Sequence, residues 1–158
     1  MADEAEGFGK AVSSNEFTGG CQCGAVRYQI KAESLVSYAC HCRECQKQSA
    51  SAFGISVPVW KASVTVVGDT GVWRRPTDSG SHTDCHYCKN CGTRVCHAGA
   101  NRPGMITIKG GSLDSALELQ PVAHIWTASK QGWVVLPVGI PQWERQPTSQ
   151  EEWITLLT

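Results

Sequence analysis

Apolar and polar residues alternate along several short stretches of the chain, which is the pattern of half-buried β-strands. In AVRYQI (25–30), Val26, Tyr28 and Ile30 alternate with polar residues. HTDCHY (82–87) and TRVCHA (93–98) flank a cysteine-rich turn and predict a hairpin. Three other strands are predicted in FGISVPVW (53–60), SVTVVGDTG (63–71) and GMITIKGG (104–111). Pro58 places its strand at an edge or near a strand end.

Helical patterns are scarce and short. CRECQKQSA (42–50) predicts two or three turns of helix, and SQEEWITLL (149–157) has Ser149 and Glu152 in capping-box positions before a short apolar face. Residues 121–137 predict one strand, a turn near 130–132 and a second extended run. We therefore expect a mostly-β domain over residues 17–158, with residues 1–16 forming a flexible N-terminal tail.

Composition narrows the range of functions. The 158 residues carry a formal net charge of +0, and no apolar run approaches the length of a membrane span. We therefore expect neither a nucleic-acid nor a membrane partner. Arg74 and Arg75 form the only dense basic step, and a solvated loop tip is favoured over an anion site. Because the N-terminal segment lacks the apolar run of a secretory signal, we expect the protein in the cytoplasm.

Nine cysteines are the unusual feature of this composition. A reducing compartment disfavours a disulfide scaffold, and an odd number cannot pair completely. Metal binding is therefore the leading explanation. The cysteines fall into three spaced groups and one isolated residue: Cys21 and Cys23; Cys40, Cys42 and Cys45; Cys85, Cys88 and Cys91; and Cys96.

Two of the pairs predict one closed site. Cys88 and Cys91, followed by Gly92, form a zinc knuckle that lacks two ligands, and Cys21 and Cys23 can supply them. A four-thiolate site has no open position, so its role would be structural. Cys85 offers an alternative to Cys88 that would shift the knuckle by three residues, although Cys88 makes the better knuckle.

The remaining triad, Cys40, Cys42 and Cys45, has three ligands and no evident fourth, which is typical of a catalytic zinc. A zinc with three thiolates suits a thiol substrate, which it can hold as the reactive thiolate. The triad could instead be a second structural site or a metal-free redox set of thiols. The candidates for a distant fourth ligand are Cys85, His86, His97 and His124.

Other residues have weaker signals. Trp126 is the first choice for a pocket wall, and His124 and Lys130 flank it and could meet a substrate carboxylate. His41 lies between two ligand candidates and is interpreted as a spacer. Cys85 and Cys96 lie in predicted strands and are interpreted as small core residues.

The chain resembles the Gfa-like family over residues 17–145. The resemblance rests on four motifs in this order: GGCQCGAVRY, CHCRECQKQSASAF, YCKNCGT and HIWTASKQGW. This family includes glutathione-dependent formaldehyde-activating enzymes and the centromere protein V domain. The resemblance implies a zinc-stabilised β-tent-like fold of several small sheets with short helices. It also implies two zinc ions, a structural one on Cys21, Cys23, Cys88 and Cys91 and a catalytic, more labile one on Cys40, Cys42 and Cys45.

The activity that the resemblance implies is that of a carbon–sulfur lyase resembling S-(hydroxymethyl)glutathione synthase. Its substrate would be an adduct of a small thiol, with glutathione as a candidate cosubstrate, and formaldehyde or another electrophile. Two alternatives stay open: a non-enzymatic zinc module for protein partners, and a thiol or zinc redox sensor. The oligomeric state is open as well, with a homodimer as one arrangement.

Overall fold

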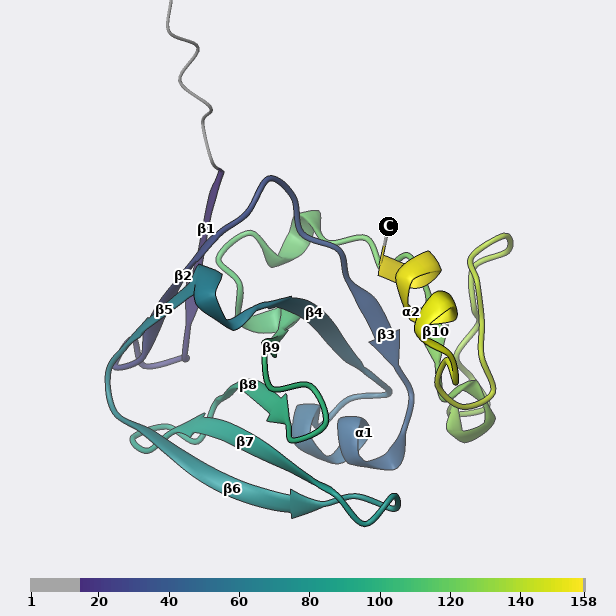
Figure 1. Cartoon of the computed structure of the whole chain (residues 1–158), viewed down its shortest axis with the longest axis horizontal. Helices are drawn as coiled ribbons and strands as arrows, with labels where there is room; N and C mark the ends of the chain where they lie inside the picture. Colours follow the sequence, from purple (N-terminus) through teal and green to yellow (C-terminus); the bar gives the residue numbers. More distant parts are fainter. Residues whose placement is uncertain (1–14, 158) are drawn as a thin grey trace, which may run out of the picture.

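The computed structural model describes residues 15–157, and strands dominate it (Figure 1). Three antiparallel strands form a small sheet in the order β1-β2-β5. Their bounds are β1 Glu16–Gly20, β2 Arg27–Lys31 and β5 Val64–Val67. Gly68, at φ +106°, follows β5 where the chain leaves this sheet. A Cβ there would meet the Ala25 carbonyl, so this crossing requires glycine.

The other seven strands form a large sheet in the order β10-β3-β4-β9-β8-β7-β6. All its neighbours are antiparallel except β10 and β3. The bounds are β3 Tyr38–Cys40, β4 Gly54–Trp60, β6 Thr70–Pro76, β7 His82–Cys88, β8 Arg94–Gly99, β9 Met105–Lys109 and β10 His124–Ile125.

Two α-helices and four 3-10 turns complete the described chain. The helices are α1 Arg43–Ser49 and α2 Gln150–Leu157, and the turns are η1 Lys61–Ser63, η2 Gly110–Ser112, η3 Ala116–Glu118 and η4 Thr127–Ser129. In Figure 1, α1 follows β3 directly, and α2 lies beside β10 at the far side from the small sheet. No helix in this part of the chain is long and apolar enough to cross a membrane.

The main core lies between the two sheets. Tyr28 and Ile30 of β2 pack in one buried cluster with Val57 of β4 and Ile108 of β9. Alternate residues of the large sheet point to opposite faces, so one face of β4 and β9 faces this core. The other face, which carries Ser56 and Lys109 as cross-strand partners, is left for a different use.

A second buried cluster joins β3 to the C-terminal helix. Tyr38, Ile125 and Leu156 are buried in it, and the Tyr38 and Trp153 rings meet edge to face with centroids 5.8 Å apart. The helix begins with the expected capping box: the Glu152 N–H donates to Ser149 Oγ (3.0 Å), and the Ser149 N–H donates to the Glu152 carboxylate (3.2 Å).

The mostly-β prediction with short helices is confirmed, and each predicted strand and helix has a counterpart. Pro58 pairs with Thr107 of β9 but lies beyond the end of the β3 pairing, as its missing N–H requires. The extended run after Gly132 forms no strand. Residues 1–14 of the expected tail lie outside the described residues. Glu16, at its end, is the first residue of β1 and pairs with Lys31 of β2.

The prediction for Arg74 and Arg75 is wrong. Both residues lie within β6, not at a loop tip, because Trp73 to Pro76 pair with the facing residues of β7. Neighbouring residues of a strand point to opposite faces. Arg74 forms an ion pair with Asp84 at 2.7 Å, whereas Arg75 lines a pocket described below.

Candidate metal centres and the adjoining pocket

Four cysteines converge at the edge where the two sheets meet. The Sγ atoms of Cys21, Cys23, Cys88 and Cys91 all lie within 4.8 Å of one another. The Cys21–Cys23 and Cys23–Cys88 sulfur pairs are 3.6 and 3.8 Å apart, far longer than a disulfide bond. A tetrahedron with metal–sulfur bonds of about 2.3 Å has sulfur–sulfur edges of about 3.8 Å. This group can therefore hold a metal ion of zinc size.

The surrounding chain favours thiolates at this group. The Val26 N–H and the Asn90 side-chain amide donate to the sulfurs of Cys21 and Cys23, each at 3.2 Å. The Thr93 hydroxyl contacts Cys91 Sγ at 3.2 Å, and this contact, together with hydrogen bonds from the Thr93 and Cys23 backbone, lowers the pKa of Cys91 to about 5. Hydrogen bonds of this kind hold metal-binding sulfurs in their charged form and fix their direction. Burial and the neighbouring thiols raise the pKa of Cys88 to about 11, so without a metal the negative charge is shared unevenly within the group.

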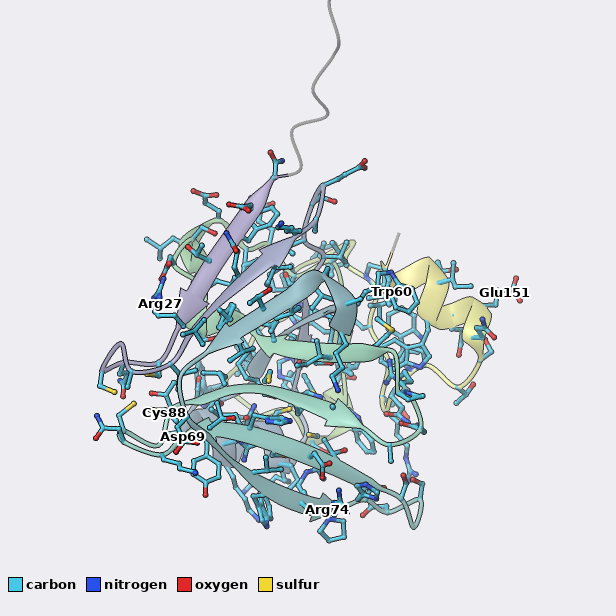
Figure 2. All side chains as sticks on the ribbon, turned by 60° about the vertical axis from the view of Figure 1, so that its left-hand side comes forward. Arg27, Trp60, Asp69, Arg74, Cys88 and Glu151 are labelled. Atoms are coloured by element: carbon cyan, nitrogen blue, oxygen red, sulfur yellow. The ribbon has the colours of Figure 1, made fainter. Side chains whose placement is uncertain are left out.

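The group links the two sheets. Cys21 and Cys23 lie on the β1–β2 connection, whereas Cys88 ends β7 and Cys91 lies in the β7–β8 turn. Both turns need glycine at positive φ, Gly24 at +77° and Gly92 at +76°. Figure 2 shows Cys88 at the opposite side of the molecule from Glu151 in α2.

The sulfurs of Cys40, Cys42 and Cys45 form a second group, again within 4.8 Å of one another. Cys40 ends β3, Cys42 caps the N-terminus of α1, and Cys45 lies in the first turn. The Cys42 sulfur accepts the Cys45 N–H at 3.3 Å, so the helix start fixes both residues. Among the described residues, none of Cys85, His86, His97 and His124 joins this group.

This triad is set up to carry negative charge. Hydrogen bonding from the Cys40 and Cys45 thiols, together with the Cys45 N–H, holds the pKa of the Cys42 thiol far below its usual range. Hydrogen bonding with the Cys42 and Cys45 thiols, and then burial, raise the pKa of Cys40. The geometry of the triad therefore favours a thiolate at Cys42, and a bound cation would favour the same state for all three sulfurs. The triad can also hold a metal ion.

A buried polar network supports the segment that carries the triad. The His41 ring is fully buried, and its Nε2 lies 2.9 Å from Nδ1 of His124. The Gln46 side-chain amide donates to the carbonyls of His41 (2.6 Å) and Ser129 (2.9 Å). These contacts tie the cysteine loop to α1 and to the chain after β10.

We expect His124→Ala to lower the free energy of unfolding by about 1–3 kcal/mol, because it leaves the His41 ring without its buried partner. The loop between Cys40 and Cys42 should then hold metal less tightly, while the Cys21 group is unaffected. Urea unfolding and metal titration measure both effects. His86→Ala, at a partly exposed histidine of β7, is the matched control. Equal stability of the two variants would contradict this role.

A pocket of about 490 Å³ adjoins the triad. Its floor is the face of the large sheet turned away from the main core, with Ser56 of β4, Thr107 of β9 and Cys85 of β7 along it. Cys40, Cys42 and Cys45 all line it, so their sulfur group opens into space large enough for a small ligand.

Trp126, chosen from the sequence as a pocket wall, is among the residues that line this pocket. Its backbone is left-handed (φ +58°), a conformation that costs about 1–3 kcal/mol for such a residue. Two backbone hydrogen bonds hold it there: its N–H donates to Arg145 (2.6 Å), and its carbonyl accepts from Ser129 (3.0 Å).

His124 and Lys130 are not among the residues that line the pocket. His124 is directed at His41, and Lys130 Nζ donates to the Val134 carbonyl at 2.9 Å. Five cationic residues do line it: Arg75, Arg94, Arg102, Lys109 and Lys47, the last of which pairs with Glu44. The sequence pointed to none of them as pocket residues, and for Arg75 it favoured a loop tip over an anion site. Of the cysteines outside both groups, Cys96 lies in the main core, and Cys85 is buried on the pocket floor.

Comparison with known proteins matches the chain to a family model and to solved structures. The family model described as glutathione-dependent formaldehyde-activating enzyme matches residues 16–129, most of the chain. A crystal structure of a Rhodobacter sphaeroides protein is similar in fold, with a TM-score of 0.50 and 18% sequence identity. The alignment covers 80% of this chain and 98% of that one.

Proposed function

Because the chain belongs to the family of glutathione-dependent formaldehyde-activating enzymes, we propose that it is a zinc-dependent carbon–sulfur lyase. Its reaction would join a small thiol to formaldehyde or another electrophile, and the reverse step would release them. In the forward direction the thiol sulfur bonds to the carbonyl carbon, and the carbonyl oxygen becomes a hydroxyl with the proton that the thiol gives up. Glutathione is the thiol that the family name indicates.

One observation carries the proposal: three sulfurs, without a fourth side-chain ligand in the described part of the chain, open into a pocket. A site closed by four ligands is structural, whereas a three-ligand site leaves a position for a substrate. Zinc bound by Cys40, Cys42 and Cys45 would favour the thiolate form of an incoming thiol. The Cys21 group is assigned the structural zinc.

The residues around the triad hold the reactants together. The backbone at Cys42 and Cys45 fixes the sulfurs, and Trp126 and Ser56 border the adjoining space. Holding the thiol and the aldehyde side by side converts a bimolecular reaction into an effectively unimolecular one, and this proximity supplies much of the expected acceleration. Lys109, whose charge acts on Cys45 and Cys40, favours a negative charge on the reacting sulfur.

The test uses the zinc-loaded protein with glutathione and ¹³C-formaldehyde. These reactants also combine without a catalyst, so the measurement is the exchange rate between free formaldehyde and its thiol adduct, by NMR exchange spectroscopy. We expect exchange well above the uncatalysed rate at micromolar protein. An unchanged rate with glutathione, and with a panel of other small thiols and aldehydes, would contradict the lyase assignment.

A further inference from the structure

The pocket concentrates positive charge in a chain whose formal net charge is +0. Four cationic side chains that line it, Arg75, Arg94, Arg102 and Lys109, form what we call the cationic cluster. None of the four forms an ion pair with a carboxylate of residues 15–157. Among residues 15–157, the pocket is also lined by Lys47 and by one acidic residue, Glu44, and these two pair with each other at 3.4 Å.

Outside the pocket, Arg27 pairs with Asp114, Arg74 with Asp84, and Lys89 with Asp69. Other described cations outside the pocket form no ion pair (Lys31, Arg43, Lys61, Lys130 and Arg145), so what distinguishes the cluster is that its four unpaired cations line one pocket. The contrast is sharpest in β6, where Arg74 is paired on one face and Arg75 is unpaired on the other. Cations brought together without counter-ions repel one another, so a bound anion would stabilise them.

Two of the guanidinium groups are held in position by aromatic rings. Arg94 lies over the Trp73 ring at 5.8 Å from its centroid, and Arg102 lies over the Trp153 ring at 4.6 Å. Stacking of this kind uses the flat face of the guanidinium and leaves its N–H groups at the edges free. Such edges are suited to two-pronged binding of a carboxylate or phosphate.

A half-buried histidine, His97, lies in the same pocket as the cluster. His97 Nδ1 is buried and has no hydrogen-bond partner among the described residues, which is uncommon for a buried polar atom. Burial, and then the charges of all four members of the cluster, hold the pKa of His97 well below its ordinary value. The ring is therefore neutral, with one unused nitrogen where the four positive charges converge.

Lys109 connects the cluster to the triad. It pairs with Ser56 across β4 and β9, on the sheet face that forms the pocket floor. Burial lowers the pKa of its ammonium group, while the charges of Cys45 and Cys40 act in the opposite direction. A ligand with its sulfur at the triad therefore has the cationic cluster along the remainder of the same pocket.

We propose that the cationic cluster is an anion subsite that selects the substrate of the proposed lyase, so that its thiol must carry carboxylate groups or a phosphate group. The sulfur end of this assignment rests on the proposed function, whereas the anion end rests on the cluster alone. Carboxylates and phosphates share the required chemistry. Neutral and cationic thiols of the same size would bind poorly.

The test measures binding without catalysis. S-methylglutathione carries the carboxylates of glutathione but no free thiol, and S-methyl-4′-phosphopantetheine carries a phosphate in their place. Each is titrated calorimetrically into zinc-loaded protein, with the diethyl ester of S-methylglutathione, which keeps the ammonium group but has no carboxylate, as the comparison. Lys109→Met and Arg75→Gln are compared with two matched controls: Lys61→Met, at an exposed lysine outside the pocket, and Arg74→Gln.

We expect an anionic probe to bind at least about 10-fold more tightly than the ester. That advantage should shrink at least about 10-fold in Lys109→Met and Arg75→Gln, at equal zinc content, and persist in both controls. The better of the two anionic probes identifies carboxylate or phosphate as the natural group. The subsite is overturned if neither probe outbinds the ester, or if the pocket variants bind like their controls. If the expected binding pattern occurs but thiol–aldehyde exchange is not accelerated, the subsite stands and the lyase assignment fails.

Discussion

Cys88→Ser is expected to leave the protein largely unfolded at 25 °C. Cys88 is buried, and its sulfur belongs to the group that joins the β1–β2 connection to the β7–β8 turn. Binding of a structural zinc by small domains is worth about 10–16 kcal/mol at neutral pH. A domain of this size is stable by only about 5–15 kcal/mol in total. Loss of one of the four ligands is therefore expected to weaken zinc binding by more than the net free energy of unfolding.

Circular dichroism and a thermal melt of the purified variant measure this effect, with zinc counted per chain. Cys85→Ala is the matched control, because Cys85 lies on the same strand, is equally buried and is outside both sulfur groups. It should cost no more than about 1–2 kcal/mol. If Cys88→Ser and Cys85→Ala had the same melting temperature, the four-sulfur group would not be what holds the two sheets together.

The same comparison decides between the two knuckles that the sequence allows. Counting residues leaves Cys85 and Cys88 as rivals three positions apart. The structure places the Cys88 sulfur in the four-sulfur group and leaves the Cys85 side chain on the pocket floor. The two cysteines lie on either side of a register shift in the β7–β8 pairing, between His86 and Tyr87. Such a shift is set by pairing with β8, so it cannot be read from the spacing of cysteines.

Local chemistry explains which parts of the site the sequence could predict. The triad lies within six consecutive residues, and its grouping follows from a strand end and one helical turn. The four-sulfur group joins positions 65 residues apart, yet each half is a short local motif with glycine beside it. Both groups were therefore predictable as candidates before the fold was known.

The cationic cluster carries no such local signal. Its members lie on β6, β8, the β8–β9 connection and β9, and only the order of the large sheet places them around one histidine. His124 was expected to flank Trp126 and to meet a substrate carboxylate, and that role stays a prediction. In the structure His124 is directed at His41, whereas Trp126, with a left-handed backbone directly after β10, lines the pocket.

Cys42→Ser should abolish the second metal site and leave the fold intact. Serine is among the best N-cap residues, so its hydroxyl can accept the Cys45 N–H that the Cys42 sulfur accepts now. The helix start is kept, while the sulfur whose pKa is lowered most strongly is lost. We expect zinc to fall from two ions per chain to one, with the melting temperature changed by only a few degrees.

The catalytic consequence should be much larger than the structural one. Thiol–aldehyde exchange should fall at least about 100-fold, because the reacting sulfur loses its fixed position beside the electrophile. Cys96→Ala, at a buried core cysteine outside both groups, should retain both zinc ions and the exchange rate. Binding of S-methylglutathione by Cys42→Ser should be nearly unchanged, since this probe has no thiol and the cationic cluster is intact. A variant that loses one zinc but keeps the exchange rate would place the chemistry elsewhere in the pocket, and the three-sulfur group would then be a second structural site.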